Sequence, residues 1–146
     1  MELKRAATLV RIRTLEQDIA LSAWGKAQQD RQLAEHARDE WAAKLNDWAA
    51  QVGSGGVRTA KHVREQLMQL SHARVMLDGR TEQVDVAKVV EAERHSEWQQ
   101  RKQRQEGVIR LHDRVETELR TAELQQEQML IDDITSTRHQ RRGEAT

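Results

Sequence analysis

The chain has no proline in 146 residues, and its glycines cluster at one place only, Gly53, Gly55 and Gly56. Proline breaks or kinks a helix, and each glycine inside a helix costs about 1 kcal/mol relative to alanine. The helix formers Ala, Leu, Glu, Gln, Lys and Arg predominate on both sides of this cluster. The chain is therefore expected to form two long helices joined by one glycine turn.

The composition alone is compatible with disorder as well as with helix, because 33% of the residues are charged and only 3% are aromatic. The spacing of the apolar residues favours helix. In the first stretch they recur every seven residues, which is typical of a coiled-coil seam. One row holds Ala20, Ala27, Ala34, Trp41 and Trp48; the companion row holds Trp24, Leu45 and Val52 together with Arg31 and Arg38; Ile12, Leu15 and Ile19 continue the stripe upstream with a shifted phase.

The second stretch shows the same spacing. One row holds Val63, Leu70, Leu77, Val84 and Trp98, a second starts at Ala60 and Leu67, and a third holds Val108, Val115, Ala122 and Met129. Polar residues are expected to interrupt this seam at Arg74, Lys88, Glu91, His95 and Lys102. Polar seam residues lower stability and fix the register of pairing.

These patterns predict an all-α fold, an antiparallel two-helix coiled-coil hairpin formed as a single domain over residues 1–146. The predicted helices cover about residues 5–52 and 59–139, with the turn at 53–56 and a frayed tail at 140–146. At 1.5 Å per residue they measure roughly 72 Å and 120 Å. The shorter helix runs out near Gln105 of its partner. The amphipathic remainder of the second helix is then expected to need a partner in another chain.

Several classes of function are excluded by residue content. Without cysteine there is no disulfide and no Cys-based zinc site. The 24 basic and 24 acidic residues leave no overall positive charge for nucleic acid. No run approaches the roughly 18 apolar residues of a membrane span, and the opening residues are too charged for a signal peptide. A cytoplasmic protein with no membrane insertion is expected.

No catalytic constellation is recognisable, and we expect neither an enzyme nor a bound metal or cofactor. The glycine cluster lacks the Lys and hydroxyl residue of a phosphate-binding loop, since Val57 and Arg58 follow it. No two of the six histidines lie three or four residues apart. The basic runs at 94–110 and 138–142 are interpreted as solvated faces, although the second could also contact a partner.

Three stretches resemble one protein family. Leu9–Leu15 (LVRIRTL) is similar to the apolar-basic start of the injectisome members, and Trp98–Arg104 (WQQRKQR) to a segment of the flagellar members. Glu127–Ile134 (EQMLIDDI), followed by a basic end, resembles the ending common to both branches. With its unequal helices and glycine turn, the chain resembles the YscO/HrpO/FliJ family, the central stalks of type III secretion and flagellar export ATPases.

The resemblance implies a non-catalytic stalk or adaptor that enters the hexameric secretion ATPase and links it to the cytoplasmic domain of the export gate, at the cytoplasmic base of the apparatus. It also implies chaperones of secreted subunits as partners. The residues it points to are Leu67, Leu70 and Ala73 for the gate, and Met129, Asp132, Asp133 and Arg138 for the ATPase.

The N-terminal stretch and the lack of Tyr and Phe favour the injectisome branch; the flagellar branch is the alternative. A generic coiled-coil scaffold that forms a homo-oligomer through the C-terminal helix is a further alternative, and a nucleic-acid binder is the least favoured.

Overall fold

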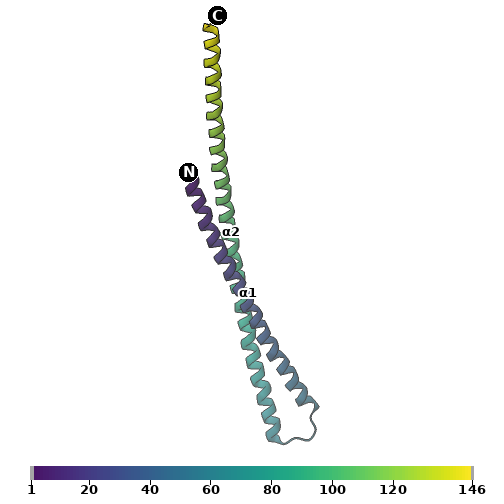
Figure 1. Ribbon diagram of the computed structural model, residues 1–146. Helices are drawn as coiled ribbons and strands as arrows, with labels where there is room; N and C mark the ends of the chain where they lie inside the picture. The colour runs from purple at the N-terminus through teal and green to yellow at the C-terminus, as the bar shows by residue number, and fades with distance from the viewer. Residues whose placement is uncertain (1, 146) are drawn as a thin grey trace. The chain divides into compact units, whose positions relative to one another are not determined.

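A computed structural model describes residues 2–145 of the chain. They form two α-helices, α1 (Leu3–Ser54) and α2 (Ala60–Glu144), which pack against each other (Figure 1). No strand occurs among these residues. The all-α fold class and the helical hairpin expected from the sequence are confirmed. Neither helix, over its described length, contains a stretch apolar enough to cross a membrane.

The helix bounds differ in detail from the predicted ones. The first helix continues through two of the residues assigned to the turn and ends at Ser54, and the linker covers residues 55–59. The second helix continues to Glu144, so most of the predicted frayed tail at 140–146 is helical as far as it is described. Since nothing in the sequence stops this helix before its end, the extension follows from the same helix-forming composition.

The residues of the chain group into two compact units. One unit, here called the linker unit, comprises Asp18–Gln100 and includes the linker between the helices. The other, here called the terminal unit, comprises Met1–Gln17 and Arg101–Thr146. Each unit contains a stretch of α1 and a stretch of α2, so each has its own part of the interface between the helices.

The linker is held by two residues at its C-terminal end. The hydroxyl Oγ1 of Thr59 accepts a hydrogen bond from the backbone N–H of His62 at 3.2 Å, which caps the start of α2. The guanidinium of Arg58 donates to the backbone oxygen of Gln51 at 2.8 Å, near the end of α1. It lies where a Cβ on Gly55 would stand. No described glycine has a positive φ; at Gly55 the missing side chain therefore makes room for the arginine.

The two helices meet along a narrow seam of side chains. Its fully buried members are small, with Val84 the largest: Ala6, Ala27, Ala73 and Val84. Every residue of the two rows predicted for the first helix is buried or half-buried, including Arg31 and Arg38. The predicted α1 seam is thus observed from Ala20 to Val52, and it lies within the linker unit.

Part of the predicted seam is wrong. The side chains of Ile12, Leu15 and Ile19 are exposed, so the upstream stripe lies outside the interface. On α2 most of the row starting at Ala60 is also wrong. Its members Ala60, Leu67, Arg74, Lys88 and Lys102 are exposed, and the residues just before the last four, Gln66, Ala73, Ala87 and Arg101, are buried or half-buried instead. His95, which belongs to the same row, is half-buried as predicted.

Pairing in the terminal unit reaches further than expected. Val108, Leu111, Val115 and Glu116 are half-buried, so the uncovered part of α2 begins at Thr117 and not after Gln105. The difference arises at the linker. Because α1 continues to Ser54 and α2 starts only at Ala60, each α1 residue faces a higher-numbered α2 residue than a turn at 53–56 predicts.

The seam makes a direct prediction about stability. Val84 is 1% exposed and Val86, two residues away on the same helix, is 63% exposed. Val84→Ala removes buried methyl groups and is expected to lower the free energy of unfolding by about 2 kcal/mol. Val86→Ala is expected to leave it unchanged or slightly raised, because alanine is the better helix former. Urea unfolding followed by circular dichroism measures both; equal losses would contradict the observed seam.

Candidate interaction surfaces

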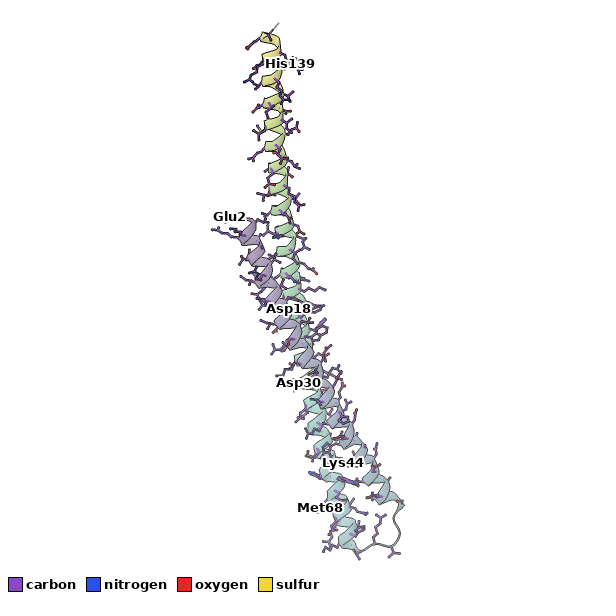
Figure 2. All side chains as sticks on the ribbon, viewed as in Figure 1. Glu2, Asp18, Asp30, Lys44, Met68 and His139 are labelled. Carbon is purple, nitrogen blue, oxygen red and sulfur yellow. The ribbon has the colours of Figure 1, made fainter. Side chains whose placement is uncertain are left out.

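The C-terminal part of α2 extends beyond the stretch that pairs with α1 (Figures 1 and 2). All residues from Thr117 to Ala145, here called the distal segment, are exposed. The segment nevertheless carries large aliphatic side chains that are about half to two-thirds exposed: Leu119, Leu124, Met129, Leu130, Ile131 and Ile134. A single helix with this many exposed aliphatic residues is typical of a binding segment.

The charges of the distal segment are separated along its length. Residues 117–133 contain five carboxylates (Glu118, Glu123, Glu127, Asp132 and Asp133) and one arginine, Arg120. Residues 134–145 contain Arg138, Arg141 and Arg142 against Glu144. His139, which Figure 2 labels near the end of α2, belongs to this basic part. The balanced charge of the whole chain therefore conceals an acidic stretch followed by a basic end.

The four residues predicted to contact an ATPase all lie in the distal segment. Met129, Asp132, Asp133 and Arg138 are exposed and come from three consecutive turns of α2. Asp132 accepts a hydrogen bond from the side chain of Gln128 at 3.1 Å, which leaves most of its surface open to solvent. The structure thus places these side chains on one accessible stretch.

The three residues predicted to contact an export gate differ in how far they are buried in the seam. Leu67 is exposed, Leu70 is half-buried and Ala73 is fully buried between the helices. Leu67 therefore offers the largest surface of the three to another protein, and Ala73 offers none unless the hairpin opens. The exposed neighbours of Leu67 on the same stretch of α2 are Val63 and Met68.

A second exposed apolar surface was missed by the sequence analysis. Met68, Val75 and Val89 lie at multiples of seven residues from one another, with Val86 one turn from Val89, and all are more than half exposed. We call these four residues the outer α2 row. The same heptad spacing that marks a seam could have revealed it.

Polar contacts cross the interface in the terminal unit. The carboxylate of Glu16 accepts hydrogen bonds from Arg13 on its own helix at 2.9 Å and from Arg101 on α2 at 3.2 Å. The side-chain amide of Gln105 donates to Thr14 Oγ1 at 3.0 Å. The hydrogen bond from Arg13, aided by Arg101, lowers the pKa of the Glu16 carboxyl below its ordinary value. These bonds fix the register of the unit with polar groups.

The linker unit combines an ion pair with stacked aromatic rings. Arg31 bonds Glu91 across the interface and Glu35 along α1, and these carboxylates raise the pKa of its guanidinium. Trp24 and Trp98 stack with centroids 5.1 Å apart, and His95 lies 4.5 Å from Trp24. Glu91 and His95 are thus polar seam residues, as predicted. The tryptophans pack in the seam and do not form an open stacking platform.

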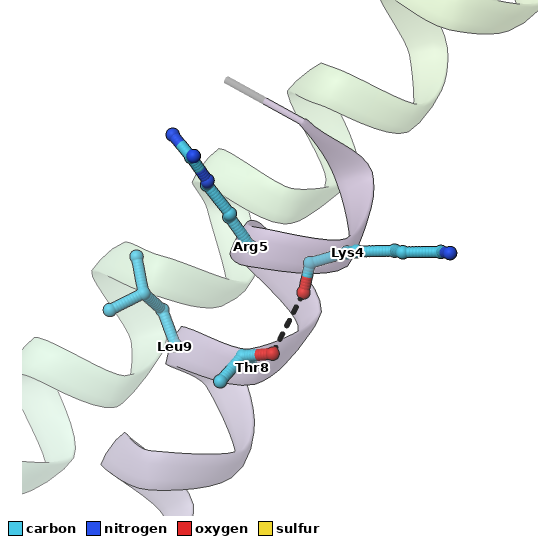
Figure 3. A pocket seen from close by; sticks show the side chains of 4 residues that line it. All are labelled: Lys4, Arg5, Thr8 and Leu9. Atoms are coloured by element: carbon cyan, nitrogen blue, oxygen red, sulfur yellow. Dashed lines mark hydrogen bonds between the residues drawn. The ribbon is translucent and has the colours of Figure 1, made fainter.

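Two small features of the terminal unit are candidates for a ligand or metal site. A depression along the first turns of α1 is lined by Lys4, Arg5, Thr8 and Leu9 (Figure 3). The Thr8 hydroxyl donates to the Lys4 backbone oxygen at 2.9 Å, so it stabilises its own helix. On α2, ligand atoms of His112, Asp113 and Glu116 lie within 4.8 Å of one another. All three belong to one turn of α2, and Asp113 is exposed.

The lowered pKa of Glu16 predicts a pH dependence of stability. Because the pKa is lower in the folded chain, the stabilisation is present above the ordinary glutamate value of about 4.3 and is lost as the pH falls through the folded-state pKa. Glu16→Gln should therefore be less stable than the wild type at pH 7, and the gap should be smaller at a pH below the ordinary glutamate value. Urea unfolding at both pH values measures this. Glu106→Gln, an exposed change in the same unit, is the control; a gap for Glu16→Gln that persists at low pH would contradict the assignment.

Comparison with known proteins gives one match. No curated protein and no solved structure matches the chain. The model of one protein family, described as flagellar FliJ protein, matches residues 3–144. This match includes both helices, the linker and nearly all of the distal segment. Since it extends over almost the entire sequence, the chain belongs to the FliJ family.

Proposed function

We propose that the chain is a non-catalytic stalk of a flagellar export apparatus, which inserts into a hexameric export ATPase and links it to the cytoplasmic domain of the export gate. The observation that carries this proposal is the FliJ family match over residues 3–144. It favours the flagellar branch over the injectisome branch that the opening residues suggested. The protein would act at the cytoplasmic base of the apparatus.

The geometry supports a role in binding. Among residues 2–145 no polar or charged residue is buried, so the described chain has no enclosed polar site of the kind that tunes catalytic groups. It does carry a long helix whose last 28 residues, 117–144, are uncovered. A ring-shaped partner can enclose such a helix from all sides, which suits its aliphatic residues on several faces.

The ATPase contact is proposed at the distal segment. Met129 supplies an apolar surface, Asp132 and Asp133 supply negative charge, and Arg138 supplies positive charge one to two turns later. Charged groups at an exposed interface govern specificity and the rate of association more than affinity. Charge reversal is therefore a sharper test of this contact than truncation.

The gate contact is proposed at Leu67 with its exposed neighbours Val63 and Met68. Leu70 and Ala73, included in the original prediction, would support this surface from inside the seam and would not touch the gate. The outer α2 row offers a further apolar surface, and we propose it for chaperones of exported subunits. Its residues remain exposed while the two helices are paired, so this contact needs no opening of the hairpin.

The ATPase contact can be tested with purified components. Adding the chain to the export ATPase of the same organism is expected to promote hexamers and raise ATP turnover several-fold. Asp132→Arg with Asp133→Arg should abolish most of the rise, because the local charge is reversed. Glu82→Arg, an equally exposed change on α2, should retain it. Unchanged turnover with the wild-type chain would refute the contact.

Two substitutions test the gate contact: one is expected to change binding, and the other is expected to change stability. Leu67→Ser is expected to weaken binding to the cytoplasmic domain of the gate about tenfold, consistent with losing one half-exposed aliphatic anchor, with unfolding little changed. Ala73→Leu should instead lower stability, since Ala73 has no exposed surface and a larger side chain must displace the facing helix. Calorimetric titration and urea unfolding measure the two effects. Full gate affinity in Leu67→Ser would exclude this surface.

The injectisome branch is the second candidate, favoured by Leu9–Leu15 and by the absence of Tyr and Phe. Adding the chain separately to a flagellar and to an injectisome ATPase distinguishes the branches, because ATP turnover should rise only for the cognate enzyme. The nearest gene that encodes a secretion ATPase gives the same information. Stimulation of the injectisome ATPase alone would move the chain to that branch.

A further inference from the structure

The charges of the distal segment are complementary to those of a second copy of the same segment. Its acidic stretch, Glu118 to Asp133, is followed by a basic end containing Arg138, Arg141 and Arg142. If a second copy of the segment lies antiparallel, the basic end of each copy faces the acidic stretch of the other. In a parallel pair, like charges would face each other along the whole length, which is destabilising. The order of the charges along the segment therefore favours a second copy of the chain in the antiparallel orientation.

The aliphatic residues lie where such a pair would need them. Placing Glu118–Glu127 opposite Arg138–Arg142 sets the midpoint of the antiparallel pair near Leu130. Ile131 and Ile134, three residues apart and so on one face of the helix, lie at this midpoint with Leu130 beside them, and each is more than half exposed in the single chain. An apolar centre with charged flanks is the usual anatomy of a protein interface, and a two-fold pair repeats both charged flanks by symmetry.

From these two coinciding features we propose that two copies of the chain associate antiparallel through residues 117–142. The paired length corresponds to nearly four heptads, which is sufficient for a coiled coil of moderate stability. This inference goes beyond the proposed function and does not depend on it, since it needs no ATPase. Both the pair and the proposed ATPase contact use Met129, Asp132, Asp133 and Arg138, so they would exclude each other.

The oligomeric state of the full chain is the first test. Sedimentation equilibrium at low salt is expected to show a monomer–dimer equilibrium with a dissociation constant on the order of 10 μM, weakened by added salt. Arg138→Glu with Arg141→Glu should weaken the dimer about tenfold or more, and Glu118→Lys with Glu123→Lys should do the same. An equimolar mixture of the two variants should restore association, because each charged flank of the heterodimer then faces a flank of the opposite sign; the orientation of the pair is decided by the cross-linking below.

The charge-reversal variants need a folding control. Circular dichroism should show unchanged helical content, since all four substituted residues are exposed. Asp85→Lys with Glu93→Lys, exposed changes on α2 of the linker unit, should leave the dimer intact. A wild-type chain that remains monomeric at tens of micromolar, or variants whose mixture does not associate more strongly than either alone, would overturn the proposal.

Orientation can be measured by cross-linking, because the chain has no native cysteine. In the antiparallel pair, residue 140 of each copy lies opposite residue 121 of the other, and about 29 Å along the axis from residue 140 of the other. Gln140→Cys and Thr121→Cys should each fail to cross-link alone with a short thiol reagent and should cross-link when mixed. Gln140→Cys that cross-links with itself indicates a parallel pair and refutes the proposal. Neither experiment contains ATPase, so its result is independent of the turnover assay.

Discussion

The interface between α1 and α2 is the constraint on which the rest of the structure depends. Two packed helices bury their apolar side chains along one shared interface. Within residues 2–145 the fully buried positions are three alanines and one valine. Small side chains allow close approach of two helices but bury little area each. The stability of the fold must therefore be spread along the seam, with many half-buried residues contributing modestly.

Polar contacts supply the register that such a shallow seam cannot specify by shape. Arg31 with Glu91 in the linker unit, and Glu16 with Arg101 in the terminal unit, each join α1 to one position of α2. A shift by one residue would leave these groups without their partners, whereas it would move one small apolar side chain past another at little cost. In each unit the ion pairs select the alignment, and the apolar rows make it stable.

The sequence predicted the fold because helix formation depends on local composition. The absence of proline and the single glycine cluster were sufficient for two helices, and the α1 rows were correct because that helix has one dominant apolar stripe through Trp41 and Leu45. On α2 the row through Leu70, Leu77 and Val84 was correct, but most of the companion row was wrong, since exposed residues such as Met68 and Val75 offer equally regular alternatives. The choice among these rows depends on residues about 60 positions away, such as Arg31 for Glu91, which local spacing does not contain. The prediction of the gate contact was limited in the same way. Leu67 and Ala73 are both apolar, and only the pairing of the two helices determines that Leu67 is exposed and Ala73 is buried.

The positions of the tryptophans have a consequence for spectroscopy. Trp24, Trp41, Trp48 and Trp98 all belong to the linker unit, and the chain has no tyrosine or phenylalanine. Intrinsic fluorescence therefore reports on that unit alone, while the terminal unit, with the distal segment, is optically silent except in the far ultraviolet. A comparison of fluorescence and circular dichroism on one unlabelled sample would thus resolve whether the two units melt together or in turn.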